Sequence, residues 1–414
     1  MEDQRVESHS IEVAKQVLEV FGVILLVGTM SGFFGRKLRL PDVAVFLVVG
    51  MLLGPAVSGV VNIKADSALN QIILVFGSSY ILFDGGASLR LSVLKKVWIS
   101  IVSLATVGVL ITAFVTAAAA QVILGIPWIV ALLLASAIAS TDPATLVPVF
   151  KQVKIRESVA QTVMSESAFN DAVGAILTFA VLALAMGKGE FSFGSAMMDL
   201  AQQAGIGLVA GLVLGWLAAL LIAHEKYAFL EEYAPVVSLM AVIGAYLGAD
   251  GLHASGFMAV FVFGIVIGNK DAFGFEMKEE EQKKLEEFTA TTALVMRMFI
   301  FILLGSQVDF ALMRAHLWEG LAVVAVFVFV ARPLSVFVCV LPDRRARWTW
   351  REMLFMCWTR ETGVIPGALA GMLMGLNAPQ APLIASVTFI AILVTILLQA
   401  TTTKWVAGKL GLLE

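Results

Sequence analysis

Residues 128–150 read WIVALLLASAIASTDPATLVPVF, a hydrophobic run that is interrupted near its middle by Ser140, Thr141, Asp142 and Pro143. The run is long enough to cross a bilayer as a helix. Pro143 lacks a backbone donor and disfavours the helical conformation of the residue before it. A simple proline kink is one interpretation. The adjacent carboxylate favours another, a transmembrane helix that opens at Asp142 and exposes backbone groups to protein or water.

The whole chain has the composition of a membrane protein. Of its 414 residues, 59% are hydrophobic and only 14% are charged, and the mean hydropathy is +0.93. Soluble domains carry about 25% charged residues. The net charge of −3 provides no basic field for nucleic acid. Cys339 and Cys357 lie far apart in apolar runs, so they form neither a disulfide framework nor a metal-ligand spacing.

A window of about 20 residues, the length of a membrane-spanning helix, predicts thirteen spans. The expected fold class is therefore an all-α polytopic membrane protein. The predicted spans lie at 11–34, 41–62, 70–88, 97–125, 128–150, 157–187, 199–223, 233–249, 253–269, 289–308, 315–342, 351–376 and 381–408.

Loop charges indicate the orientation of these spans, because cytoplasmic loops retain Lys and Arg. If the N-terminus is outside, the predicted cytoplasmic loops carry 20 Lys and Arg residues and the outside segments carry 5. The sequence therefore predicts an outside N-terminus and a cytoplasmic C-terminus. We expect a single transport domain in the inner membrane of a prokaryote, without a soluble regulatory domain.

Two carboxylates in the sixth predicted span, Glu166 and Asp171, lie far from any predicted membrane interface. Asp171 shares a helix face with Ser167, four residues earlier. Glu166 points about 140° away from Asp171, since a helix has 3.6 residues per turn. We therefore expect the two acids to have different partners. Asp171 and Ser167 would face an ion cavity with Thr141 and Asp142, and Glu166 would turn toward a buried arginine.

Four short motifs, in order along the chain, resemble those of one protein family. They are TDP at 141–143, ESAFND at 166–171, SGFMAV at 255–260 and FILLG at 301–305. Together they resemble the monovalent cation:proton antiporters of the first subfamily. This is the sodium/proton exchanger group that carries an asparagine-aspartate motif, and the similarity extends over nearly the whole chain.

The resemblance implies a fold of thirteen helices, usually in a homodimer, with two inverted six-helix repeats. Two unwound helices would cross near the ion site. The repeats would span about 11–187 and 233–408, with 199–223 as the linking helix. The twelfth span then corresponds to the fifth, and it too is interrupted, by TRETG at 359–363. Interrupted spans at matching places in two halves indicate a transport site.

The resemblance also implies a role for each site residue. Asp171 would bind the cation and the proton in turn, and Glu166 would form a structural ion pair with Arg332. The residues that would line or support the site are Asn170, Asp142, Thr141 and Ser167. Arg360 would support it as well, although this chain has TRET where many relatives have LRGA, which places Glu361 beside Arg360.

Elementary electrostatics leads to the same mechanism. A carboxylate in a low-dielectric cavity is destabilised in its charged form, so a proton and an alkali cation compete for it. Of Asn170 and Asp171, only Asp171 can ionise. If Glu166 is paired with Arg332 and Asp142 only supports the site, one Na⁺ or K⁺ should exchange electroneutrally for one H⁺. The sequence does not choose between Na⁺ and K⁺. It contains no Walker A or dinucleotide motif, and we expect a transporter without cofactors and not an enzyme.

Two alternatives belong to other classes of protein. A monovalent cation channel could line its pore with the same Asp and Thr residues. An intramembrane aspartyl protease could use Asp142 and Asp171, which lie in adjacent spans. Such proteases carry Tyr-Asp and Gly-x-Gly-Asp motifs, whereas Thr141 and Asn170 precede the two acids here. The sequence therefore favours the exchanger over the protease.

Overall fold

The computed structural model describes residues 2–38, 40–65, 67–141, 150, 155–187, 193–224 and 227–413. Within these ranges the regular structure is helical, apart from an isolated bridge between Ile155 and Leu413. The helices are α1 (Glu2–Leu38), α2 (Asp42–Leu53), α3 (Ala68–Ala87), α4 (Leu91–Ser103), η1 (Leu104–Gly108), α5 (Val109–Leu124), α6 (Trp128–Ile138), α8 (Glu157–Ala185), α9 (Phe193–Ala223), η2 (Glu231–Tyr233), α10 (Ala234–Gly251), α11 (Gly256–Gly268), η3 (Lys270–Phe273), α12 (Glu279–Ser306), α13 (Phe310–Ala315), α14 (Leu317–Val326), η4 (Phe327–Ala331), α15 (Arg332–Val340), α16 (Trp350–Trp358), α17 (Val364–Gly375), α18 (Ala381–Val394), η5 (Thr395–Ala400) and α19 (Thr401–Lys409).

Nine helical stretches in the described residues are long and apolar enough to cross a membrane. Three of them contain a π-helical segment, η1, η4 or η5. Each of the nine corresponds to one predicted span. Four shorter apolar helices, α2, α6, α11 and α17, lie in the other four predicted segments. The prediction of a helical polytopic membrane fold is confirmed.

A sharp turn separates α10 from α11, the two predicted spans that are closest in sequence. α10 ends at Gly251, and His253 has a φ of 54°, a left-handed conformation that a helix cannot continue through. Ser255 then caps α11, because its Oγ accepts a hydrogen bond from the Met258 N–H at 3.2 Å. The predicted boundary between these two segments is confirmed.

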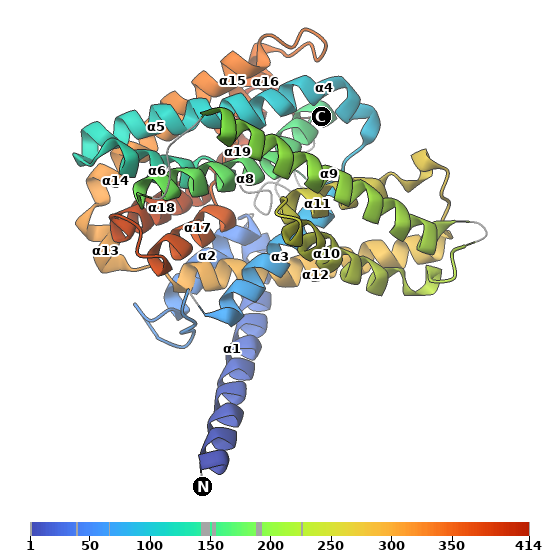
Figure 1. Ribbon diagram of the computed structural model, residues 1–414, viewed down its shortest axis with the longest axis horizontal. Coiled ribbons are helices and arrows are strands. Elements are labelled where there is room, and N and C mark those ends of the chain that lie inside the picture. The colour runs from blue at the N-terminus through green and yellow to red at the C-terminus, as the bar shows by residue number, and fades with distance from the viewer. Residues whose placement is uncertain are drawn as a thin grey trace.

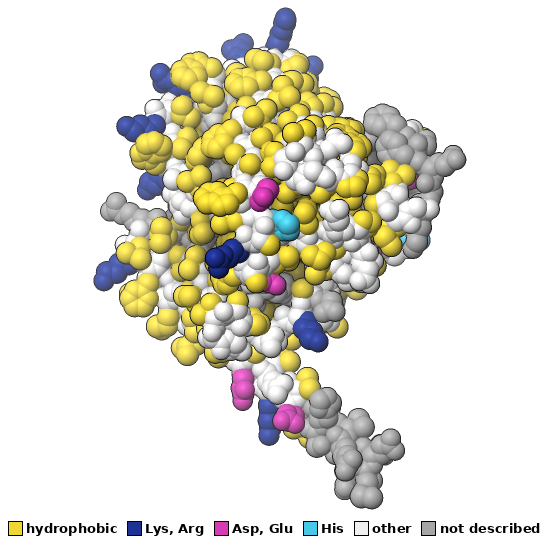
Figure 2. All heavy atoms as spheres, turned by 90° about the vertical axis from the view of Figure 1, so that its left-hand side faces the viewer, with side chains coloured by type: hydrophobic (Ala, Val, Ile, Leu, Met, Phe, Trp, Pro, Cys, Tyr) yellow, Lys and Arg dark blue, Asp and Glu magenta, His cyan; other side chains and the backbone are white. Residues whose placement is uncertain are grey.

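The outer surface is largely hydrophobic. Figure 1 shows the helices gathered into one body, from which the N-terminal part of α1 projects. Hydrophobic side chains cover most of the face in Figure 2, and most of the basic side chains lie along its upper and left edges. Val122, for example, is 82% exposed, and Phe33 and Phe34 are each 57% exposed. Apolar surface of this extent is expected where helices contact lipid.

Two glycines allow α2 and α12 to pack backbone against backbone. A Cβ on Gly305 would collide with the carbonyl oxygen of Leu47, and a Cβ on Gly50 would collide with that of Ile302. Small residues are typical of such close helix contacts in membranes. α12 also packs against α17, which lies in the predicted twelfth span.

We expect Gly305→Ala to lower the free energy of unfolding by about 3 kcal/mol, the upper part of the range for overpacking, because a backbone carbonyl cannot move aside. The matched control is Gly244→Ala in α10, where a Cβ would meet no atom within 4 Å. That change should be neutral or slightly stabilising. Thermal unfolding of both purified variants measures the difference. Equal unfolding midpoints would show that the α2–α12 contact is not rigid.

Candidate ion-binding site

The interruption predicted in the twelfth segment is present. α16 ends at Trp358 and α17 begins at Val364, and residues 359–363 between them are non-helical and buried. α16 itself starts with a capping box, in which the side chains of Thr349 and Glu352 each bond the backbone of the other. The break therefore occurs after a well-formed helix. It leaves buried backbone groups that need partners.

Side chains of the last span form hydrogen bonds with backbone groups at and beside this unwound segment. Gln399 Nε2 donates a hydrogen bond to the carbonyl oxygen of Trp358 at 2.7 Å. The backbone N–H of Thr362 donates to Thr395 Oγ1 at 3.0 Å. Both partner side chains lie in η5 and are buried. The last span thus stabilises the open conformation of the twelfth segment.

Sequence reasoning missed these partners, although a signal was present. Thr395, Gln399 and Thr403 are spaced four residues apart in an apolar run, so they share one helix face. Thr403 Oγ1 donates to Glu361 Oε1 at 3.4 Å. Glu361 is fully buried, and it contacts the same polar face through this bond.

Arg360 joins the two interrupted spans. Its Nη2 donates a hydrogen bond to the carbonyl oxygen of Ala139, just after the end of α6. In a continuous helix that carbonyl would accept from the backbone nitrogen of residue 143, which is proline and carries no hydrogen. The guanidinium carbon of Arg360 also lies 4.9 Å from the centre of the Phe327 ring, a cation–π contact. The buried guanidinium of Arg360 thus donates the hydrogen bond to the Ala139 carbonyl that a proline nitrogen cannot donate.

The first interruption begins earlier than predicted. α6 ends at Ile138, and Ser140 and Thr141 are already non-helical, whereas the sequence predicted opening at Asp142. The physical reason is the backbone N–H of Thr141, which donates to Asn170 Oδ1 and not to the carbonyl of residue 137, its acceptor in a continuous helix. Asp142 itself lies outside the described residues.

Asn170 fixes the position of Thr141. The backbone N–H of Thr141 donates to Asn170 Oδ1 at 3.0 Å, and Asn170 Nδ2 donates to Thr141 Oγ1 at 2.9 Å. Both residues are buried. One turn further along α8, a Cβ on Gly174 would come within 3.1 Å of Ser140 Cβ. The non-helical end of α6 is therefore held tightly against α8.

Asp171 and Ser167 are buried on α8, with exposed fractions of 1% and 0%. Ser167 Oγ has no hydrogen-bond partner among the described residues. A buried hydroxyl of this kind can bind a water molecule or a cation through its oxygen. The predicted position of Asp142 beside Asp171 falls outside the described residues. The structure thus describes the α8 residues of the predicted site and not Asp142.

The structure pairs Glu166 with Arg332. The two guanidinium nitrogens bond the two carboxylate oxygens, with Nη1 on Oε1 and an Nη2–Oε2 distance of 2.8 Å. Arg332 Nε also donates to the carbonyl oxygen of Met356 at 3.0 Å. Both charged side chains are 1–2% exposed. This bidentate pair ties α8 to α15 and to α16, the first half of the interrupted span.

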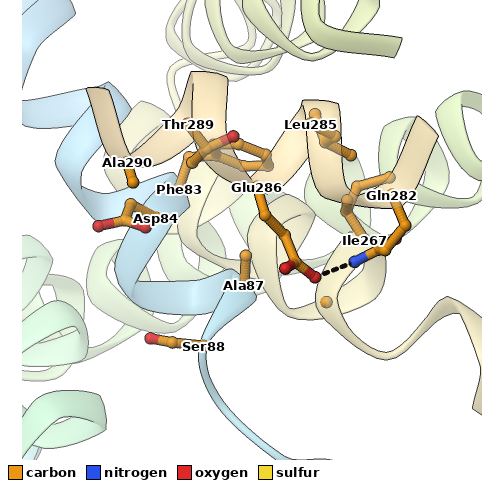
Figure 3. A pocket seen from close by; sticks show the side chains of 11 residues that line it. Phe83, Asp84, Ala87, Ser88, Ile267, Gln282, Leu285, Glu286, Thr289 and Ala290 are labelled. Carbon is orange, nitrogen blue, oxygen red and sulfur yellow. Dashed lines mark hydrogen bonds between the residues drawn. The ribbon is translucent and has the colours of Figure 1, made fainter. Parts of the chain in front are cut away.

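A separate acidic cavity of about 360 Å³ lies between α3, α11 and α12 (Figure 3). The carboxylates of Asp84 and Glu286 line it. Gln282 Nε2 donates to Glu286, and Gln282 Oε1 accepts a hydrogen bond from Lys270 Nζ. Burial lowers the pKa of Lys270, because it destabilises the ammonium ion. The described members of the predicted site do not line this cavity.

The chain is similar to known membrane antiporters over almost its full length. The family described as sodium/hydrogen exchanger, transmembrane, matches residues 22–409. The chain is 32% identical to Na(+)/H(+) antiporter 1 of Methanocaldococcus jannaschii, over 94% of each chain. It is 27% identical to the K(+)/H(+) antiporter NhaP of Alkalimonas amylolytica, over 97% of this chain and 68% of the relative.

The structural similarity is equally extensive. The structure of the sodium proton antiporter MjNhaP1 from Methanocaldococcus jannaschii at pH 8 matches with a TM-score of 0.79 and 28% identity. The match covers 95% of this chain and 99% of that one. The resemblance that the sequence motifs indicated is therefore confirmed, and the chain belongs to the sodium/hydrogen exchanger family.

Proposed function

We propose that the chain is a secondary active antiporter that exchanges a monovalent cation, Na⁺ or K⁺, for a proton. The observation that carries this proposal is the hydrogen bond between Arg360 and Ala139. It joins two interrupted helices, and α6 packs against α8, which carries the buried carboxylate of Asp171. Broken helices that meet in this way are typical of transport sites. The relatives named as Na⁺/H⁺ and K⁺/H⁺ antiporters support the same function.

Asp171 is the proposed exchanging group. One negative charge in a site removed from water can be neutralised by a cation or by a proton. The proposed ligands of the cation are Asp171, Asp142, Thr141 and Ser167. Support comes from Ser167 Oγ, which is buried without a hydrogen-bond partner in the described structure. If only the neutralised protein moves between inward and outward states, the two fluxes are coupled.

Four residues have proposed supporting roles. Asn170 holds Thr141 in its non-helical conformation through two hydrogen bonds. Arg360 places a fixed positive charge at the junction of the interrupted helices. Glu166 and Arg332 neutralise each other, and neither would exchange protons during transport. This leaves Asp171 as the exchanging acid on α8.

The architecture that we propose has thirteen spans, with inverted repeats at about 11–187 and 233–408 and a linking helix at 199–223. The π-helices support this pairing. η1 lies in the fourth predicted span and η4 in the eleventh, which are equivalent positions in the two repeats. The fourth and eleventh spans also pack together, because η1 contacts α15 and Gly108 faces Cys339 of α15. We further propose a homodimer in a prokaryotic inner membrane, with the N-terminus outside and the C-terminus in the cytoplasm.

The test is sodium-driven proton flux in proteoliposomes, read with a pH-sensitive dye and repeated under an imposed potassium–valinomycin potential. We expect added Na⁺, Li⁺ or K⁺ to release an established proton gradient. We expect the imposed potential to leave the flux unchanged, because one-for-one exchange moves no net charge. If K⁺ is itself transported, current recording on a solid-supported membrane replaces the potential clamp.

Two results would contradict this proposal at different points. A channel cannot use a proton gradient to move a cation uphill, so failure of uphill transport would contradict antiport. A flux that follows the imposed potential, or a steady transport current, would contradict electroneutral exchange. That second result would identify Asp142 as a second exchanging acid.

A further inference from the structure

Exposed basic side chains gather where α15 and α19 end and where α16 begins. They lie on the α15–α16 loop, on the first turn of α16, just before α8 and at the end of α19. We call this group the basic surface, and its members are Arg156, Arg344, Arg345, Arg347, Arg351 and Lys409. Two tryptophans of the same region are also exposed, Trp350 by 60% and Trp405 by 64%. Arg351 and Lys409 lie over their rings at 5.6 and 5.9 Å.

A buried acid holds the arginine-rich loop in place. Asp343 is 4% exposed, and its Oδ2 accepts a hydrogen bond from Ser100 Oγ at 2.7 Å. Its Oδ1 accepts from the backbone N–H of Arg345 at 3.1 Å. Trp348 Nε1 also donates to Ser100 Oγ at 2.9 Å. These hydrogen bonds therefore anchor the loop to α4 through Ser100, and the arginine side chains of the loop remain exposed.

The basic surface contains a cavity of about 600 Å³, lined by Arg156 and Arg351 together with Thr349, Trp350 and the C-terminal turn at 411–413. Glu352 also lines it, but this acid is 2% exposed and is already bonded. Its Oε1 accepts from Arg156 Nη1 at 2.8 Å, and its Oε2 accepts from the Thr349 N–H at 2.7 Å. Arg351 forms no salt bridge with a described residue.

The location indicates which anion would bind there. The basic surface lies at the ends of membrane-spanning helices, where tryptophan is favoured between hydrocarbon and water. Arginine binds phosphate oxygens through two parallel hydrogen bonds. A free phosphate ion would use the arginines alone, whereas a phospholipid would also use the exposed faces of Trp350 and Trp405. The cytoplasmic leaflet is enriched in anionic lipids, and these lipids attract basic segments that lie near it.

We infer that this cavity binds the headgroup phosphate of an anionic phospholipid. Arg351 contacts the phosphate, and Trp350 packs against the glycerol and the upper acyl chain. The other arginines of the basic surface add electrostatic attraction. The bound lipid joins the C-terminal turn to the start of α16, because Arg351 lies beside Gly411.

The test measures lipid-dependent thermal stability of the purified full-length protein in neutral detergent. Dioleoylphosphatidylglycerol, dioleoylphosphatidylcholine and inorganic phosphate are titrated separately. We expect phosphatidylglycerol to raise the unfolding midpoint in a saturable way, because a ligand of the folded state stabilises it. The two other titrants should produce no saturable shift. Arg351→Gln should weaken the apparent phosphatidylglycerol affinity about fivefold, the effect of one charge near an anionic surface.

Arg314→Gln is the matched control, because Arg314 is exposed four residues before the exposed Trp318, at the opposite end of the helical stretch Leu317–Val340. It should bind phosphatidylglycerol as the parent does. Arg345→Gln is a second surface variant and should also lose affinity. An equal response to phosphatidylcholine or to inorganic phosphate would overturn the inference. Unchanged affinity in both Arg351→Gln and Arg345→Gln, or equal loss in Arg314→Gln, would overturn it as well.

Discussion

Asp171→Asn is expected to abolish cation-driven proton exchange and to leave the protein folded. The substitution keeps the side-chain volume and removes the charge that a cation and a proton would share. Asp171 is 1% exposed on α8, and its neighbour Asn170 cannot ionise and is already bonded to Thr141. The fluorescence response should therefore equal that of protein-free liposomes at every cation concentration.

The control for this variant is Asp309→Asn. Asp309 caps α13, where its Oδ1 accepts hydrogen bonds from the backbone N–H groups of Ala311 and Leu312. Asparagine caps helices about as well as aspartate, so folding and exchange should both persist. Thermal unfolding and size-exclusion chromatography verify that both variants are folded. Cation-dependent proton flux in Asp171→Asn would remove this residue from the centre of the mechanism.

The spans and one interruption could be predicted because their causes are local in sequence. A helix that crosses a bilayer needs about 20 apolar residues whichever neighbour it packs against. Arg360 and Glu361 stand out in their apolar segment for the same reason. The helical spacing of Glu166 and Asp171 also predicted that they face different partners. Burial cost and helix geometry alone therefore indicated the segments in which we propose the site.

The contacts that build the site could not be predicted from spacing. Arg360 lies 221 residues from Ala139, and Thr141 lies 29 residues from Asn170. Which groups meet over such separations depends on how the helices pack. The polar face of the last span could be recognised in the sequence. The sequence did not indicate that Gln399 would donate a hydrogen bond to the carbonyl oxygen of Trp358. The π-helix η4 was equally hidden, because its residues FVFVA are ordinary for a membrane helix.

The second large effect concerns the ion pair between Glu166 and Arg332. Glu166→Ala and Arg332→Ala should each lower the free energy of unfolding by about 3–5 kcal/mol, because each leaves a buried charge without its partner. The pair is 1–2% exposed and bidentate, so water cannot replace the lost group easily. The loss of Arg332 should be the greater one, since its Nε also bonds the carbonyl oxygen of Met356.

A double-mutant cycle measures the interaction itself. The variant with both alanines leaves no buried charge unpaired, so its loss should fall short of the summed single losses by about 2–3 kcal/mol. The control cycle uses Arg90 and Glu157, a salt bridge of 3.2 Å whose side chains are 72% and 48% exposed. Exposed pairs contribute about 0–1 kcal/mol, because water screens them. Additive losses at Glu166 and Arg332 would mean that each charge is stabilised by other groups. The tie between α8 and the interrupted span would then have to reside in the hydrogen bonds of Asn170 and Arg360.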